Sequence, residues 1–144
     1  MPDTTGSCLC GAVRFRITGA PRHAAACHCG MCRKWSGGLF MVVETTSEDI
    51  AFDGRENIGL YQSSEWAERG FCKTCGSSLF YRLTVAGAHQ GTCYVGLGTL
   101  DDPSGIAVTH EIFIDDKPDG YALAGETEKM TGAEVFQSVA PDAT

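Results

Sequence analysis

Apolar and charged residues alternate in a short stretch near the N-terminus. In residues 12–18 (AVRFRIT), the apolar residues Val13, Phe15 and Ile17 are separated by two arginines. A period of two places the apolar side chains on one face of an extended segment and the arginines on the other. This pattern predicts a half-buried β-strand.

Four further segments are rich in the aromatic and β-branched residues that favour strands. They are residues 39–44 (LFMVVE), 77–83 (SSLFYRL), 91–98 (GTCYVGLG) and 111–115 (EIFID). Turn-forming pairs such as Asp53-Gly54 and Asp119-Gly120 lie between or beside them. We therefore expect a mainly β fold with several antiparallel sheets and few or no helices.

One segment near the C-terminus carries a helical signal. Thr131 and Glu134 have the spacing of an N-terminal capping box, and Val135, Phe136 and Val139 form a short apolar face behind them. We expect one short helix there.

The composition is that of a folded globular protein. Of the 144 residues, 43% are apolar and 20% are charged. The length fits one domain of about 100 to 200 residues, and the sequence contains no linker or repeat. We expect a single domain over residues 1–144.

The charge and the hydropathy exclude two classes of partner. The formal net charge is −7, which argues against general electrostatic binding to nucleic acid or to an anionic membrane. The N-terminus lacks the apolar core of a signal peptide, and no stretch approaches the roughly 18 apolar residues of a membrane span. We expect a cytoplasmic protein; the sequence carries no signal for its oligomeric state.

The candidate chemistry lies in eight cysteines. In a chain of this kind they indicate metal binding or reactive thiols rather than a disulfide framework. By position they form three groups and a singleton: Cys8 and Cys10; Cys27, Cys29 and Cys32; Cys72 and Cys75; and Cys93.

Two of these groups form a set of four. Structural zinc is held by four ligands, and short pairs from distant parts of a chain commonly supply them two by two. Cys8, Cys10, Cys72 and Cys75 make such a set, and each pair is followed by a glycine that lets the backbone turn tightly. The spacing predicts a structural zinc site.

The third group, in CHCGMC (residues 27–32), offers three thiols and no obvious fourth ligand. Three protein ligands with an open position are typical of a catalytic zinc site. Cys93 could complete the set, but its strand context favours a small buried core residue. His28 projects away from the metal if the segment is extended, so it either forms a hydrogen bond behind the ligands or packs at the surface.

Three basic residues and one redox alternative complete the candidates. Arg33 and Lys34 follow the three-cysteine group and either lower the pKa of its thiols, hold an anionic substrate or are simply solvated. Arg69 either pairs with a carboxylate or faces water. The C-x-x-C spacing of Cys72 and Cys75 also occurs in thiol redox proteins, but no βαβ pattern surrounds it here.

Four stretches, GSCLCGAVRFRI, CHCGMCRKWSGG, ERGFCKTCGSSLFYR and GLGTLDDP, resemble the glutathione-dependent formaldehyde-activating enzyme family, which includes centromere protein V. The resemblance covers residues 6–119, the expected core, and leaves residues 120–144 as a C-terminal extension. It implies a mostly antiparallel β fold with two zinc ions. Cys8, Cys10, Cys72 and Cys75 match the structural ligands, and Cys27, Cys29 and Cys32 match the catalytic ones.

The resemblance also implies a reaction. The family joins formaldehyde to the thiol of glutathione, giving S-hydroxymethylglutathione, and is classed in reverse as a carbon–sulfur lyase. In this chain Glu111 stands where a family histidine aligns, and Gly120-Tyr121 lies near a family tryptophan. His110, one residue away, is therefore a candidate for substrate binding together with Arg33 and Lys34.

We thus expect a zinc-dependent carbon–sulfur lyase that acts on a small thiol adduct, with glutathione as the candidate thiol. The alternatives are a non-catalytic zinc module that binds another protein and a thiol redox protein.

Overall fold

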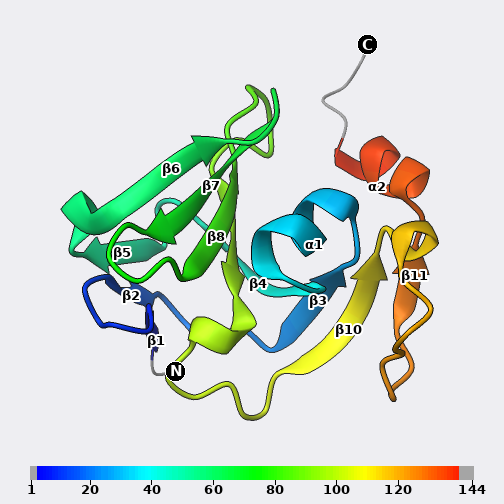
Figure 1. The fold of residues 1–144 in the computed structure, drawn as a ribbon, viewed down its shortest axis with the longest axis horizontal. Helices are drawn as coiled ribbons and strands as arrows, with labels where there is room; N and C mark the ends of the chain where they lie inside the picture. Colours follow the sequence, from blue (N-terminus) through cyan, green and yellow to red (C-terminus); the bar gives the residue numbers. More distant parts are fainter. Residues whose placement is uncertain (1–2, 140–144) are drawn as a thin grey trace.

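Eleven strands form two β-sheets in the computed structural model, which describes residues 3–139 (Figure 1). The smaller sheet has the strand order β1 (Thr4–Ser7), β2 (Arg14–Ile17) and β5 (Ile50–Asp53), all antiparallel. In β2, Phe15 and Ile17 are buried while the two arginines are exposed, as the period of two predicts.

The larger sheet has eight strands. They are β3 (His23–Cys27), β4 (Phe40–Thr46), β6 (Ile58–Gln62), β7 (Ala67–Cys72), β8 (Ser78–Leu83), β9 (Thr92–Gly96), β10 (Ala107–Ile112) and β11 (Glu128–Met130). Their order in space is β11-β10-β3-β4-β9-β8-β7-β6. The neighbours are antiparallel except that β10 runs parallel to both β3 and β11.

The mainly β class is therefore confirmed, and the predicted segments 39–44, 77–83 and 91–98 correspond to β4, β8 and β9. The predicted strand over 111–115 is wrong in its bounds, because β10 ends at Ile112. Phe113 has a left-handed backbone (φ 55°), which turns the chain into a 3-10 turn (Ile114–Asp116). Its ring packs edge-on against Phe136, with the ring centroids 5.8 Å apart.

Two short helices accompany the sheets. The predicted C-terminal helix is present as α2 (Gly132–Val139), and its capping box forms, with the Glu134 amide donating to Thr131 Oγ1 at 3.2 Å. The other helix, α1 (Gly30–Ser36), is not predicted by the sequence pattern. Within the described part of the chain, neither helix has the length and apolar character needed to cross a membrane.

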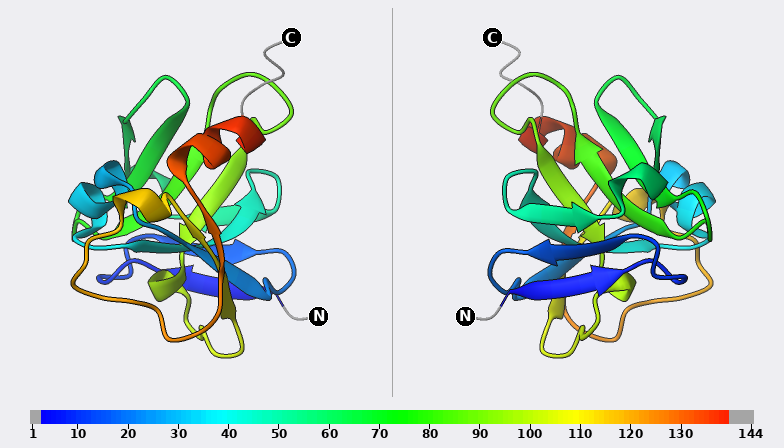
Figure 2. Two further views of the ribbon diagram at one scale, coloured as in Figure 1. Left: turned by 90° about the vertical axis from the view of Figure 1, so that its right-hand side faces the viewer. Right: turned by 90° about the vertical axis from the view of Figure 1, so that its left-hand side faces the viewer.

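The two sheets lie side by side and share a core. The smaller sheet occupies one end of the molecule and faces the viewer in the right-hand view of Figure 2, whereas β11 and α2 lie at the other end. Phe52 of β5 contacts Phe80 of β8 across the junction, with ring centroids 5.4 Å apart. A second apolar cluster lies where α1 packs on β3 and β4, and it contains Cys32, Cys27 and Phe40.

Candidate metal centres

Two cysteine pairs that are distant in sequence meet at the junction of the sheets. Cys8 and Cys10 follow β1, Cys72 ends β7, and Cys75 lies in the next turn; their sulfur atoms all lie within 4.8 Å of one another. Cys10 Sγ is 3.7 Å from Cys8 Sγ and 3.8 Å from Cys72 Sγ. Four sulfur atoms at about 2.3 Å from a tetrahedral zinc lie about 3.8 Å apart. This arrangement therefore fits a four-thiolate metal site.

Glycine forms the turn after each pair. Gly11 and Gly76 have φ values of 82° and 78°, a left-handed conformation that glycine adopts at little cost. The Gly76 amide donates to the Cys72 carbonyl at 2.8 Å, and the Gly11 amide donates to the Cys8 carbonyl at 3.2 Å. Both turns have the tight backbone that the sequence predicts.

Hydrogen bonds to sulfur favour the thiolate form of two members of this cluster, Cys8 and Cys75, whereas the pKa of Cys10 is raised to about 11. The Val13 amide donates to Cys8 Sγ at 3.3 Å, and the Cys75 amide donates to Cys72 Sγ at 3.4 Å. The hydroxyl of Ser77, 3.1 Å from Cys75 Sγ, together with the Ser77 backbone lowers the pKa of Cys75 to about 5. A thiolate is the form that binds metal.

A second cluster lies at the start of α1. Cys27 is the last residue of β3, Cys29 caps the helix, and Cys32 lies in its first turn; the three sulfur atoms are within 4.8 Å of one another. The Cys32 amide donates to Cys29 Sγ at 3.3 Å. Cys27 and Cys32 are buried and Cys29 is half-buried. The strand-to-helix junction thus brings together the three thiols that the sequence groups.

The three sulfur atoms are close enough to share protons. Hydrogen bonds from Cys27 and Cys32 lower the pKa of Cys29 to about 2. The hydrogen bonds of Cys27 with Cys29 and Cys32, together with burial, raise the pKa of Cys27 above its ordinary value. Binding of a divalent cation by the three sulfur atoms would release these protons.

Cys93 belongs to neither cluster. It is fully buried in β9, within the core shared by the two sheets. Burial raises the pKa of its thiol to about 12, so it remains protonated at neutral pH. The core interpretation agrees with this position.

Both alternatives predicted for Arg69 of β7, pairing with a carboxylate and facing water, are wrong. Its side chain is only 3% exposed, so it does not face water, and no carboxylate among residues 3–139 lies within ion-pair distance. Its Nη1 donates to Cys32 Sγ at 3.7 Å. The guanidinium lies 5.2 Å from the ring centroid of Trp35 and 4.9 Å from that of Tyr81. A charged residue on a buried strand face gives no sequence signal for such a role.

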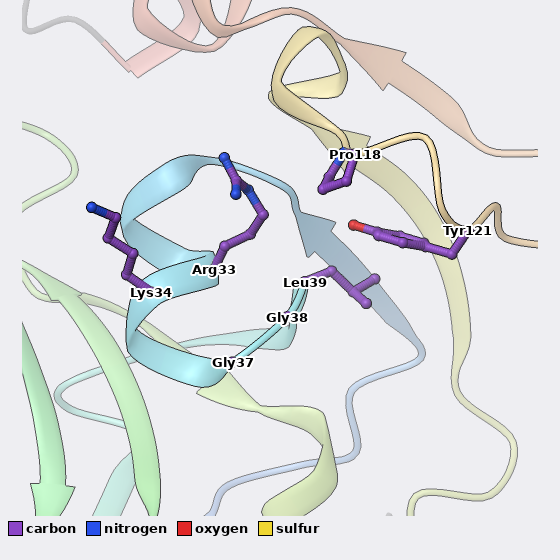
Figure 3. Close-up of a pocket in the computed structure, with 7 residues that line it drawn as sticks. All are labelled: Arg33, Lys34, Gly37, Gly38, Leu39, Pro118 and Tyr121. Atoms are coloured by element: carbon purple, nitrogen blue, oxygen red, sulfur yellow. The ribbon is translucent and has the colours of Figure 1, made fainter.

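A surface pocket adjoins α1 (Figure 3). It is lined by Arg33, Lys34, Gly37, Gly38, Leu39, Pro118 and Tyr121. Arg33 extends from α1 on the side of Pro118 and Tyr121, whereas the Lys34 ammonium points away from them. Arg33 Nε also donates to the His28 carbonyl at 3.3 Å, which places this cation directly beside the three-cysteine segment.

His110 does not line this pocket. Its Nε2 is 3.1 Å from Glu128 on β11, its Nδ1 is 2.8 Å from Thr109, and its side chain is 46% exposed. Because side chains alternate along a strand, the next residue of β10, Glu111, points the other way and is buried.

His28 and Glu111 form a buried network next to the three-cysteine cluster. His28 Nε2 is 2.8 Å from Glu111 Oε1, and His28 Nδ1 is 2.7 Å from the Tyr121 hydroxyl. The second carboxylate oxygen of Glu111 accepts a hydrogen bond from Thr127 and lies 3.7 Å from Lys129 Nζ. Burial alone would raise the pKa of Glu111, but the hydrogen bonds from Thr127 and His28 hold it below its ordinary value. His28 is therefore a buried residue whose hydrogen bonds to Glu111 and Tyr121 hold the cysteine segment 27–32 in place.

Several known proteins are similar to this chain in sequence or in fold. A profile of the family described as glutathione-dependent formaldehyde-activating enzyme matches residues 3–116. An uncharacterized lyase of Schizosaccharomyces pombe is 33% identical over 139 residues, which cover 96% of this chain and 98% of that protein. A Halomonas elongata protein, whose name refers to glutathione-dependent formaldehyde activation, is 35% identical over 52% of this chain and 53% of its own length.

A crystal structure of a Rhodobacter sphaeroides protein has a similar fold, with a TM-score of 0.56 and 24% identity, over 73% of this chain and 99% of that one. Fold and cysteine geometry together define a small, mainly β protein with two clusters that could hold metal ions. The chain belongs to the glutathione-dependent formaldehyde-activating enzyme family. The resemblance and the prediction of a lyase-type enzyme are thereby confirmed.

Proposed function

We propose that this protein is a zinc-dependent carbon–sulfur lyase acting on the adduct of a small thiol and an aldehyde, of the S-hydroxymethylglutathione type. The observation that carries the proposal is the difference between the two clusters. One gathers four sulfur atoms, whereas the other gathers three, and among the described residues no fourth histidine, cysteine or carboxylate has a ligand atom within 4.8 Å of all three. A site one ligand short leaves a position for a substrate atom.

The cysteines have two roles in this proposal. Cys8, Cys10, Cys72 and Cys75 hold a structural zinc that joins β1 to β7. Cys27, Cys29 and Cys32 hold the catalytic zinc. Zinc with an open position supplies a Lewis acid for a small carbonyl and a binding site for a thiolate.

The remaining residues orient the substrate. Arg33, with Lys34 beside it, attracts the carboxylates of an anionic thiol such as glutathione to the pocket that both residues line. Tyr121, rather than His110, faces Arg33 across the pocket, and its hydroxyl is fixed by His28. In the cleavage direction the adduct loses its hydroxyl proton, a carbonyl forms, and the electron pair of the carbon–sulfur bond leaves on sulfur. In the reverse direction the thiolate sulfur attacks the carbonyl carbon, the carbon–sulfur bond forms, and the carbonyl oxygen takes up the proton.

The proposal is tested by NMR exchange between free glutathione and its formaldehyde adduct, with zinc per chain measured on the same samples. We expect the wild type to bind two zinc ions and to accelerate the exchange, and Cys29→Ala to bind one and to leave the exchange at its uncatalysed rate. Two zinc ions without acceleration would instead indicate a binding module. A reversible disulfide with little zinc would indicate a redox protein.

A further inference from the structure

Arg69 brings a permanent positive charge into the interior beside the three-cysteine cluster. A buried guanidinium is costly unless an anion or hydrogen-bond acceptor compensates it. Within residues 3–139, the acceptor of its side chain is Cys32 Sγ, at 3.7 Å. The electrostatic partner of Arg69 is therefore a member of the cysteine cluster.

Two aromatic rings fix the guanidinium in this position. Trp35 of α1 lies on one side and Tyr81 of β8 lies on another, with ring centroids 5.2 and 4.9 Å from the guanidinium carbon. A planar, weakly hydrated guanidinium suits such stacking better than an ammonium does. The packing of β7, β8 and α1 thus holds the positively charged guanidinium of Arg69 next to Cys32.

The two clusters differ in the groups that offset the negative charge of their thiolates. In the four-cysteine cluster, backbone amides of Val13, Thr74 and Cys75 donate to sulfur. In the three-cysteine cluster, the Cys32 amide donates to Cys29 Sγ, and Arg69 adds a full positive charge beside Cys32. Three thiolates around a divalent ion carry a net charge of −1, and a fourth, incoming thiolate raises this to −2.

We propose that Arg69 is a positioning residue that offsets this charge through Cys32 and so permits an anionic thiolate, rather than a neutral ligand, to occupy the fourth position. Arg33 and Lys34 line the pocket and attract the charged substrate, whereas Arg69 contacts Cys32, one of the three metal ligands. The inference rests on the proposed function, because it requires a metal held by Cys27, Cys29 and Cys32.

The test uses the cobalt-substituted protein, since thiolate binding to Co²⁺ gives a charge-transfer absorption. Wild type, Arg69→Met and Arg69→Lys are titrated with 2-mercaptoethanol and, separately, with neutral imidazole. Arg82→Met is the matched control, because Arg82 is also a strand arginine stacked on an aromatic ring, Phe80 at 4.9 Å, but its partner is Glu68 at 2.8 Å.

We expect Arg69→Met to weaken thiol binding about tenfold or more, from the loss of a charged hydrogen bond, and imidazole binding less than about twofold. Arg69→Lys should recover part of the thiol affinity, and Arg82→Met should leave the ratio of thiol to imidazole affinity unchanged. Equal weakening of both ligands in Arg69→Met, or no weakening, would overturn the inference. If Arg69→Met does not fold, Arg69→Gln carries the same test.

The wild-type titration separates the two proposals. Uptake of a single cobalt ion, held by the four-cysteine site, would overturn both. Uptake of two ions with thiol binding that is insensitive to Arg69→Met would overturn the role of Arg69 alone.

Discussion

His28 Nε2 lies 2.8 Å from a carboxylate oxygen of Glu111, and both side chains are almost completely buried. His28 stands between Cys27 and Cys29, and Glu111 comes from β10, which runs parallel to β3. The pair therefore joins the cysteine segment to the neighbouring strand. Tyr121 extends the connection to the pocket.

Removing one member of this pair should destabilise the fold. We expect Glu111→Ala to lower the free energy of unfolding by about 3 kcal/mol, because it leaves His28 buried without its partner. The control is His110→Ala, which removes an exposed pair with Glu128 and should cost less than about 1 kcal/mol. Urea denaturation of the zinc-loaded variants measures both. If both variants lose a similar free energy of unfolding, the buried His28–Glu111 pair stabilises the fold no more than the exposed His110–Glu128 pair does.

The two cysteine clusters should respond differently to the loss of one ligand. Structural zinc contributes about 10 kcal/mol or more to the folding of small domains, so Cys72→Ala should abolish the cooperative unfolding transition. Cys29→Ala should lose one zinc but keep its near-ultraviolet circular dichroism. Zinc analysis and thermal denaturation of both variants provide the comparison. Equal collapse of the two variants would argue against an open site at Cys27, Cys29 and Cys32.

Much of the grouping of the cysteines could be predicted from the sequence, because cysteine spacing and turn glycines are local properties. Cys72, Cys75 and Gly76 determine their own turn wherever the sheet places them. Period two likewise identified β2. Both signals depend on residues that are neighbours along the chain.

The missed features depend on contacts between distant segments. In β3, Ala24 and Ala26 are buried although alanine has a low strand propensity, and the strand forms because its backbone pairs with both β4 and β10. Helix α1 is too short to show a period and begins at its Cys29 cap. Arg69 and Glu111 are charged residues in buried strand positions, where the apolar pattern predicts none.

Cys93 should be dispensable for metal binding. It is fully buried in the core shared by the two sheets, so Cys93→Ala should keep both zinc ions and cost about 1 to 2 kcal/mol for the small cavity. Its pKa of about 12 also predicts that the native thiol resists alkylation at neutral pH and reacts only after unfolding. Mass spectrometry after iodoacetamide treatment detects the modified residue. Loss of a zinc ion in Cys93→Ala would show that Cys93 is a ligand.

Arg33 should contribute more to binding of an anionic thiol than Lys34 does. Both line the pocket, but Arg33 extends toward Pro118 and Tyr121 while the Lys34 ammonium points away. We expect Arg33→Met to raise KM for glutathione about tenfold, from the loss of a charge-assisted hydrogen bond, and Lys34→Met to raise it less than about twofold. The same variants assayed with 2-mercaptoethanol, which carries no carboxylate, should retain their wild-type KM. An equal rise in KM for both thiols would mean that Arg33 maintains the shape of the site through its hydrogen bond to the His28 carbonyl and does not recognise the substrate charge.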